Sequence, residues 1–195
     1  ADKMLPSFPR DTMHPWQHNN KAYHNHLVSI RRVAAEVSGV DDGVGTVIQA
    51  IKDLGLTENT LVIFAGDQGW MGGQNGFFGM GDHTRPIGAH DLMMQVPMIV
   101  SHPGSIPSGR SDIMVSNTDF LPTVLDYLGL RHRIPHSQVQ HLSGRSYADV
   151  LRGQPIDWET AMYYEMEGCR SVRTEEWKYV ARRFPNGPGE LYDMT

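Results

Sequence analysis

A helical pattern that leads directly into a short, wholly apolar segment most constrains the fold of this chain. From about residue 22 to residue 54, apolar side chains recur at three- and four-residue intervals, which is typical of an amphipathic helix. Gly55 ends the pattern. Residues 60–65 (Thr-Leu-Val-Ile-Phe-Ala) then form an apolar run typical of a strand that is covered on both faces. A helix followed by such a strand predicts an α/β fold.

The later segments predict two sheets, one mostly parallel and one antiparallel. Residues 96–100 form a second buried strand, and residues 119–128 carry a helical pattern. Three short segments at residues 161–165, 169–173 and 177–181 predict an antiparallel meander. We therefore predict a mostly parallel sheet sandwiched by helices over residues 1–153, and a small antiparallel subdomain over residues 154–195. We interpret the aromatic residues of the meander as its packed face, the alternative being a platform for a sugar: Tyr163, Tyr164, Trp177 and Tyr179.

The composition excludes several classes of protein. The chain has 195 residues, a formal net charge of −5 and 17 scattered Lys and Arg residues, which argues against nucleic acid or an anionic membrane as a partner. Its apolar runs fall short of the ~20 residues that a transmembrane segment needs. The single cysteine, Cys169, excludes an internal disulfide and a cysteine-based zinc site. Its place in a predicted strand indicates a small packed residue.

The glycine-rich segment from residue 66 to residue 90 contains the candidate metal ligands. Asp67 and Gln68 directly follow the predicted strand, and ligands of open α/β sheets bind at the carboxyl ends of strands. A carboxylate next to a carboxamide supplies two hard oxygen donors, which suit Ca²⁺ or Mg²⁺. The alternative is that both side chains only make hydrogen bonds within the turn.

From about residue 23 to residue 193 the chain resembles the C-terminal part of the type I sulfatases, which belong to the alkaline phosphatase superfamily. The resemblance implies the rear part of the sulfatase α/β domain followed by an incomplete C-terminal subdomain. It rests on segments that occur in the family's order, at residues 39–45 with 54–64, 66–69, 96–104, 115–126, 144–146, 172–179 and 190–193.

The resemblance implies hydrolysis of carbohydrate or aryl sulfate esters. In the family, a Cys or Ser of a Cys-x-Pro-x-Arg-type motif becomes formylglycine, whose hydrate attacks sulfur while a divalent cation, usually Ca²⁺, holds the sulfate oxygens. Asp67 and Gln68 would form half of that metal site. The sequence lacks the nucleophile motif, because Cys169 has the wrong context, and Asp41 and Asp42 fall within the predicted helix as a polar face.

The resemblance thus implies a fragment that is inactive alone and whose partner is the N-terminal half of the same fold, which would carry the nucleophile and the remaining metal ligands. We expect its isolated form to aggregate, because the missing strands would leave apolar edges exposed. Family analogy places such proteins in the periplasm or outside the cell.

The segment after the metal turn departs from the family's pattern at Met80. Relatives commonly carry a Lys there that contacts the sulfate, and Met can neither donate a proton nor neutralise an anion. His83 could replace that Lys as a general acid, and Arg85 could bind sulfate, the alternative being that both are ordinary loop residues. His90 is a candidate for lining the substrate pocket.

Two other functions stay open beside the sulfatase. One is a phosphoester or phosphonate hydrolase of the same superfamily, since sulfate and phosphate esters are similar tetrahedral anions. The other is a non-catalytic homologue that only binds a metal or ligand, which Met80 and the lack of a nucleophile favour.

Overall fold

The computed structural model describes residues 27–72, 74–81, 84, 86–183 and 187–195. Contacts group these residues into two units. Unit 1 contains the described part of residues 1–55 together with residues 65–97 and 163–195, and unit 2 contains residues 56–64 and 98–162. The boundary predicted between residues 153 and 154 stays a prediction. Among the described helices, none combines the length and the apolar character needed to cross a bilayer.

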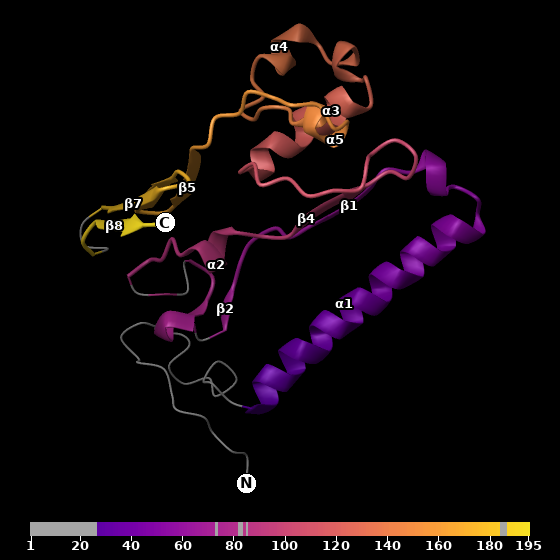
Figure 1. Ribbon diagram of the computed structural model, residues 1–195. Coiled ribbons are helices and arrows are strands. Elements are labelled where there is room, and N and C mark those ends of the chain that lie inside the picture. The colour runs from indigo at the N-terminus through magenta and orange to yellow at the C-terminus, as the bar shows by residue number, and fades with distance from the viewer. Residues whose placement is uncertain (1–26, 73, 82–83, 85, 184–186) are drawn as a thin grey trace. The chain divides into compact units, whose positions relative to one another are not determined.

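Helix α1 (Leu27–Asp53) confirms the amphipathic helix predicted from the sequence (Figure 1). Gly55 follows it with φ +69°, a left-handed conformation that glycine adopts readily. Asp41 and Asp42 are exposed on this helix, as the polar-face interpretation requires. Its apolar stripe is exposed as well, most clearly at Val37 (65%) and Val47 (59%).

In unit 2, β1 (Val62–Ala65) pairs with β4 (Met98–Ser101) in a two-stranded sheet, and Figure 1 shows the strands side by side. The His102 ring lies 3.0 Å from the carbonyl oxygen of Glu58, so the end of β4 lies beside the segment that precedes β1. The two strands therefore run in opposite directions within the α/β fold, which the hydrophobic pattern cannot reveal. Phe64 and Ile99 are exposed on them.

The helix predicted over residues 119–128 is present as η7 (Asn117–Asp119) and α3 (Phe120–Tyr127). Ser116 starts it with a capping box, in which the Asp119 carboxylate accepts a hydrogen bond from the Ser116 N–H at 2.8 Å. Asp119 is buried and also accepts from the Arg145 N–H at 2.7 Å. The other helices of unit 2 are short: η4 (Thr57–Asn59), η8 (Arg131–Arg133), α4 (His136–Val139) and α5 (Ala148–Leu151).

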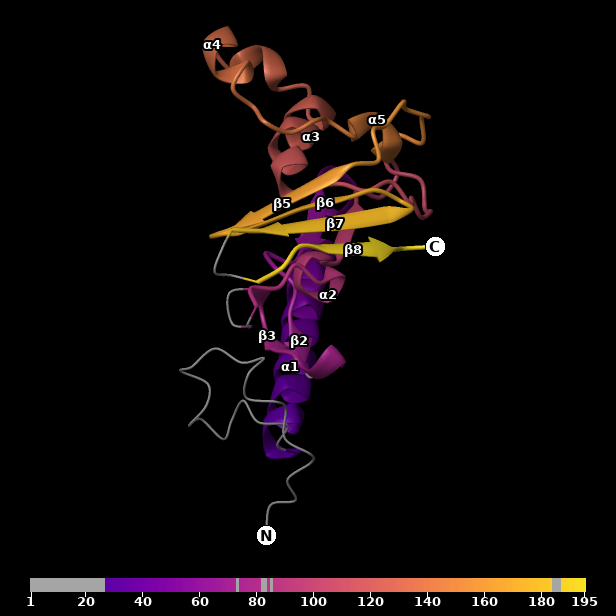
Figure 2. The same cartoon turned by 90° about the vertical axis from the view of Figure 1, so that its left-hand side faces the viewer.

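Four C-terminal strands form one sheet in the order β5-β6-β7-β8, shown as neighbouring ribbons in Figure 2. They are β5 (Met162–Met166), β6 (Cys169–Arg173), β7 (Trp177–Arg182) and β8 (Glu190–Asp193). Antiparallel pairing sets Ser171 opposite Val180 and Lys178 opposite Tyr192. This sheet confirms the predicted antiparallel meander and adds β8 to it.

The described residues between 66 and 97 in unit 1 contain several short elements. β2 (Met71–Gly72) pairs antiparallel with β3 (Phe78–Gly79), with η5 (Gln74–Gly76) between them, and α2 (Asp91–Met94) follows. Ile87 and Ala89 pack with Cys169 and Val180 in a hydrophobic cluster against the C-terminal sheet.

Ion pairs hold α2 on the same sheet. The Asp91 carboxylate accepts hydrogen bonds from Lys178 Nζ at 2.6 Å and from Arg173 Nε at 2.9 Å. The Lys178 side chain is only 4% exposed. Burial alone would raise the pKa of Asp91, but the hydrogen bond and charge of Lys178, with Arg173, outweigh burial and lower this pKa.

Exposed apolar residues on α1 predict that the isolated 195-residue chain associates with itself, because water is excluded when such stripes pair. Replacing Val40 and Val47 with Lys should reduce the associated fraction in sedimentation velocity, whereas the matched polar control Asp41→Asn should not. A sharp, reversible thermal transition of the unmodified chain as a demonstrated monomer would contradict this expectation.

Asp91→Asn should lower the free energy of unfolding at pH 7 by about 3 kcal/mol, because Lys178 would stay buried without its counter-charge. Since the folded pKa of Asp91 lies below its ordinary value of about 3.9, its contribution is full above that value and is lost as the pH falls through the folded pKa.

The Asn variant should therefore lose stability less steeply than the parent between about pH 4 and pH 2. Denaturant unfolding over this range measures the difference, with Asp112→Asn, an 82% exposed carboxylate, as the control. Parallel curves for the parent and the Asp91 variant would count against the assignment.

Candidate functional site

The turn from Gly66 to Gly69 directly follows β1 and carries the two predicted metal ligands. Asp67 and Gln68 are both exposed there. The Gly66 N–H donates to the Pro97 carbonyl oxygen at 3.2 Å, and the Gly69 N–H donates to the Met93 carbonyl oxygen at 3.0 Å. Hydrogen bonds to the segment at and after α2 therefore fix both ends of the turn.

Gly69 is glycine because the backbone of α2 lies against it. A Cβ atom at this position would lie 2.2 Å from the Leu92 carbonyl oxygen, far inside van der Waals contact. The sequence therefore allows the turn to press onto α2, and the exposed Asp67 and Gln68 lie on the residues between its two anchored ends.

The donor chemistry of this turn fits a hard cation in part. Asp67 and Gln68 offer carboxylate and amide oxygens, the donors that Ca²⁺ and Mg²⁺ take, but Ca²⁺ needs six to eight oxygens. Within the described ranges, no three His, Cys, Asp or Glu side chains gather closely enough to hold a metal. A complete site would thus need ligands beyond these two.

His90 lies directly before α2, at its N-cap, and is half-buried. Its ring lies 4.7 Å from that of Phe77 and 6.4 Å from that of Tyr192, measured between centroids. Burial, followed by the charge of Lys178, lowers the pKa of His90, which favours the uncharged imidazole. Its predicted role in lining the substrate pocket stays a prediction.

The other candidates after the turn stay predictions as well. His83 and Arg85 lie outside the described residues. Met80 directly follows β3 and is half-buried. Cys169 is fully buried in the cluster with Ile87 and Val180, and burial raises the pKa of its thiol. The interpretation of Cys169 as a packed strand residue is confirmed, since a buried neutral thiol is a poor nucleophile.

Sequence reasoning missed the charged network beneath α2. Arg182, whose side chain is 1% exposed, donates to the Ile87 and Pro188 carbonyl oxygens and pairs with Glu190 at 2.8 Å. Tyr192 donates to Glu190 at 2.5 Å, and burial together with this bond raises the pKa of Tyr192 to about 12. These residues come from strands β7 and β8, more than eighty positions beyond α2, and no local motif joins them.

The aromatic residues of the C-terminal sheet divide between its faces, which corrects their interpretation as one packed face. Tyr163 is 75% exposed, Tyr179 50% and Trp177 48%, whereas Tyr164 packs against the hydrophobic cluster. Lys178 and Val180 are buried between the exposed positions of β7. The inward face of β7 thus carries Lys178, which pairs with Asp91, and Val180, which packs in the hydrophobic cluster, rather than its aromatic rings.

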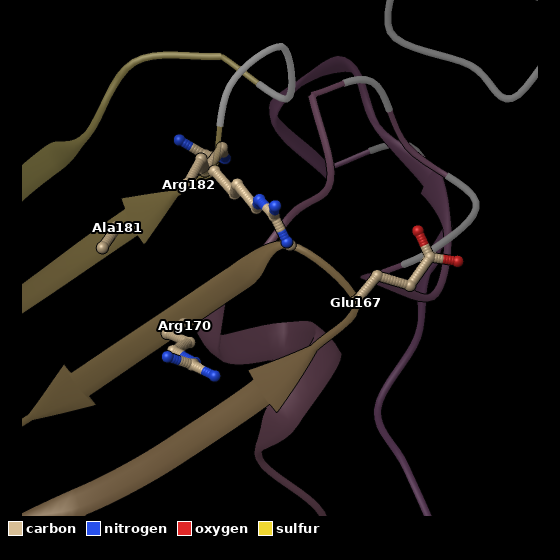
Figure 3. A pocket seen from close by; sticks show the side chains of 6 residues that line it. Glu167, Arg170, Ala181 and Arg182 are labelled. Carbon is tan, nitrogen blue, oxygen red and sulfur yellow. The ribbon is translucent and has the colours of Figure 1, made fainter.

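A pocket of about 350 Å³ lies at one end of the C-terminal sheet (Figure 3). It is lined by Glu167, Gly168, Arg170, Ala181, Arg182 and Arg183. Arg170 pairs with Glu165 at 2.8 Å, and the guanidinium of Arg182 already has the partners given above. This pocket lacks the carboxylate and amide donors of the turn after β1, and it is not the candidate site.

Two family models match the chain and together cover nearly all of it. The sulfatase model matches residues 5–130, and the model of the C-terminal part of N-sulphoglucosamine sulphohydrolase matches residues 88–195.

Several curated relatives are sulfatases. An N-acetylglucosamine-6-O-sulfatase of Bacteroides thetaiotaomicron is 28% identical over 85% of this chain and 30% of its own length. An endo-4-O-sulfatase of the same organism is 37% identical over 63% of this chain and 22% of its own. Human N-sulphoglucosamine sulphohydrolase is 32% identical over 64% and 24%. The chain thus spans between a fifth and a third of these proteins.

Several solved structures have a fold similar to that of this chain. One from a glycosaminoglycan-metabolising locus of Bacteroides thetaiotaomicron superposes with a TM-score of 0.71 at 25% identity, over 91% of this chain and 38% of that one. Another, in complex with its substrate D-glucosamine-2-N,6-O-disulfate, gives 0.64 at 26% identity, over 81% and 32%. A phosphonate monoester hydrolase from Silicibacter pomeroyi shares the fold at a TM-score of 0.63. The chain belongs to the sulfatase family of the alkaline phosphatase superfamily.

Proposed function

We propose that this chain forms the C-terminal part of a metal-dependent sulfatase that hydrolyses sulfate esters of carbohydrates, with Asp67 and Gln68 as ligands of Ca²⁺. The observation that carries the proposal is the turn after β1, which presents both oxygen donors between two anchored ends. A bound Ca²⁺ would polarise the sulfate group. The formylglycine nucleophile and the other ligands would come from the N-terminal half of the fold.

The substrate class follows from the names of the relatives. Two of them are sulfatases of N-acetylglucosamine and N-sulphoglucosamine, and one solved neighbour binds a disulfated glucosamine. These names support a sulfated amino sugar over a simple aryl ester, although an arylsulfatase K of Gallus gallus is also 27% identical over 80% of this chain.

In this proposal three residues that follow the turn in sequence donate a proton, bind sulfate or line the substrate pocket. His83 would act as the general acid in place of the Lys that Met80 replaces, and Arg85 would bind a sulfate oxygen. His90, whose ring lies near those of Phe77 and Tyr192 and whose pKa is lowered, would line the substrate pocket as a hydrogen-bonding rather than a charged group.

Two alternatives rest on specific observations. One is phosphoester or phosphonate hydrolysis within the same superfamily, to which PehA of Trinickia caryophylli, a multifunctional protein 29% identical over 71% of the chain, also belongs. Met80 favours a homologue that binds the metal and does not hydrolyse. Turnover of paired sulfate and phosphate esters by the complete gene product separates all three.

Asp67→Ala should weaken Ca²⁺ binding by at least about tenfold and reduce hydrolysis of glucosamine 6-sulfate, because one carboxylate ligand is lost. Titration calorimetry with Ca²⁺ on the complete gene product measures the affinity. Asp112→Ala, which removes an exposed carboxylate of unit 2, is the matched control and should leave the affinity unchanged. Equal Ca²⁺ affinities of the Asp67 variant and the parent would refute the proposed metal site.

A further inference from the structure

We infer that Asp91, held by Lys178 and Arg173, is a positioning residue that sets the placement of the Asp67–Gln68 turn. This inference rests on the proposed metal site. It assigns the C-terminal sheet a role in the metal centre although none of its side chains is a proposed ligand.

Two cationic side chains of the C-terminal sheet hold Asp91 in place. Lys178 on β7 and Arg173 on β6 stand opposite each other in the strand register and converge on the two carboxylate oxygens of Asp91, at 2.6 and 2.9 Å. Lys178 is almost completely buried, and its charge has little contact with water. Charge-assisted hydrogen bonds in such surroundings are short and directional, so they fix the first residue of α2 on the sheet.

Helix α2 is only four residues long and has little room to bend, so it moves as one piece. Its third residue, Met93, is 3% exposed. Its last residue, Met94, packs against the hydrophobic cluster, and its sulfur accepts a hydrogen bond from the Ser171 hydroxyl at 3.9 Å. Both ends of α2 are therefore attached to the sheet.

Helix α2 in turn contacts the turn that carries Asp67 and Gln68. The Met93 carbonyl oxygen accepts the Gly69 N–H at 3.0 Å, and the Leu92 carbonyl oxygen lies where a side chain of Gly69 would begin. A shift of α2 must therefore move Gly69, which directly follows Gln68. Metal sites tolerate displacements of only about 0.5 Å in their ligands, so a loosened α2 should weaken binding without removing a ligand.

The test is Ca²⁺ titration calorimetry on folded variants of the complete gene product, with folding checked by circular dichroism. Asp91→Asn should weaken Ca²⁺ binding about tenfold, the loss that supporting contacts of metal ligands typically cause. Glu165→Gln makes the same charge change in an exposed pair on β5 and should leave the affinity unchanged.

Arg173→Gln keeps the test open if the Asp91 variant does not fold, because Asp91 then still pairs with Lys178. It should weaken Ca²⁺ binding, by less than Asp91→Asn does. Its matched control is Arg170→Gln, which changes an exposed arginine of β6 and should leave the affinity unchanged. Terbium luminescence sensitised by Trp70, which lies three residues after Asp67, gives a second readout of the ion's surroundings.

Gly69→Ala disrupts the contact between the turn and α2 from the side of the turn. It should weaken Ca²⁺ binding as Asp91→Asn does, because the new Cβ displaces the turn from Leu92. Gly45→Ala, on α1 with nothing within 4 Å, is the control and should leave Ca²⁺ binding unchanged.

The outcomes separate this inference from the proposed function. Weaker binding in the Asp91, Arg173 and Gly69 variants, with normal binding in their controls, supports the positioning role. Unchanged affinity in these folded variants, with a large loss in Asp67→Ala, overturns the positioning role and leaves the metal site standing. Unchanged affinity in Asp67→Ala overturns both.

Discussion

The pairing of Asp91 with Lys178 and Arg173 is the interaction on which the rest of unit 1 depends. Lys178 places a positive charge where almost no water reaches it, and such a charge is stable only beside a carboxylate. Asp91 supplies the carboxylate from a segment 87 positions away in the chain. The sheet face that carries Lys178 must therefore turn toward α2, and the cluster around Cys169 and Val180 closes beneath it.

The same arrangement connects the sheet with the candidate metal turn. Because α2 is short and attached at both ends, the hydrogen bond from Gly69 to Met93 transmits its position to Asp67 and Gln68. In our inference the sheet positions α2, and α2 positions the turn that carries half of the proposed metal site.

The resemblance to the sulfatases implies one departure at the candidate site, since Met80 stands where relatives commonly carry a Lys. Met80 is half-buried, and burial together with the charge of Lys178 lowers the pKa of His90, which favours the uncharged imidazole. Neither side chain supplies positive charge to a sulfate group. The proposed activity thus depends on Arg85 and on the metal for charge neutralisation, which makes the comparison of Ca²⁺ binding with turnover informative.

The sequence by itself determined the elements with local causes. The apolar spacing of α1, its end at Gly55 and the strand before Asp67 follow from helix and strand periodicity, which acts between near neighbours. Only the tertiary structure decided which face of β7 is inside, because alternation fits Trp177 and Tyr179 or Lys178 and Val180 equally well. Residues distant in sequence make the choice, because Lys178 pairs with Asp91 and Val180 packs with Ile87 and Ala89, and contacts across that distance leave no local pattern.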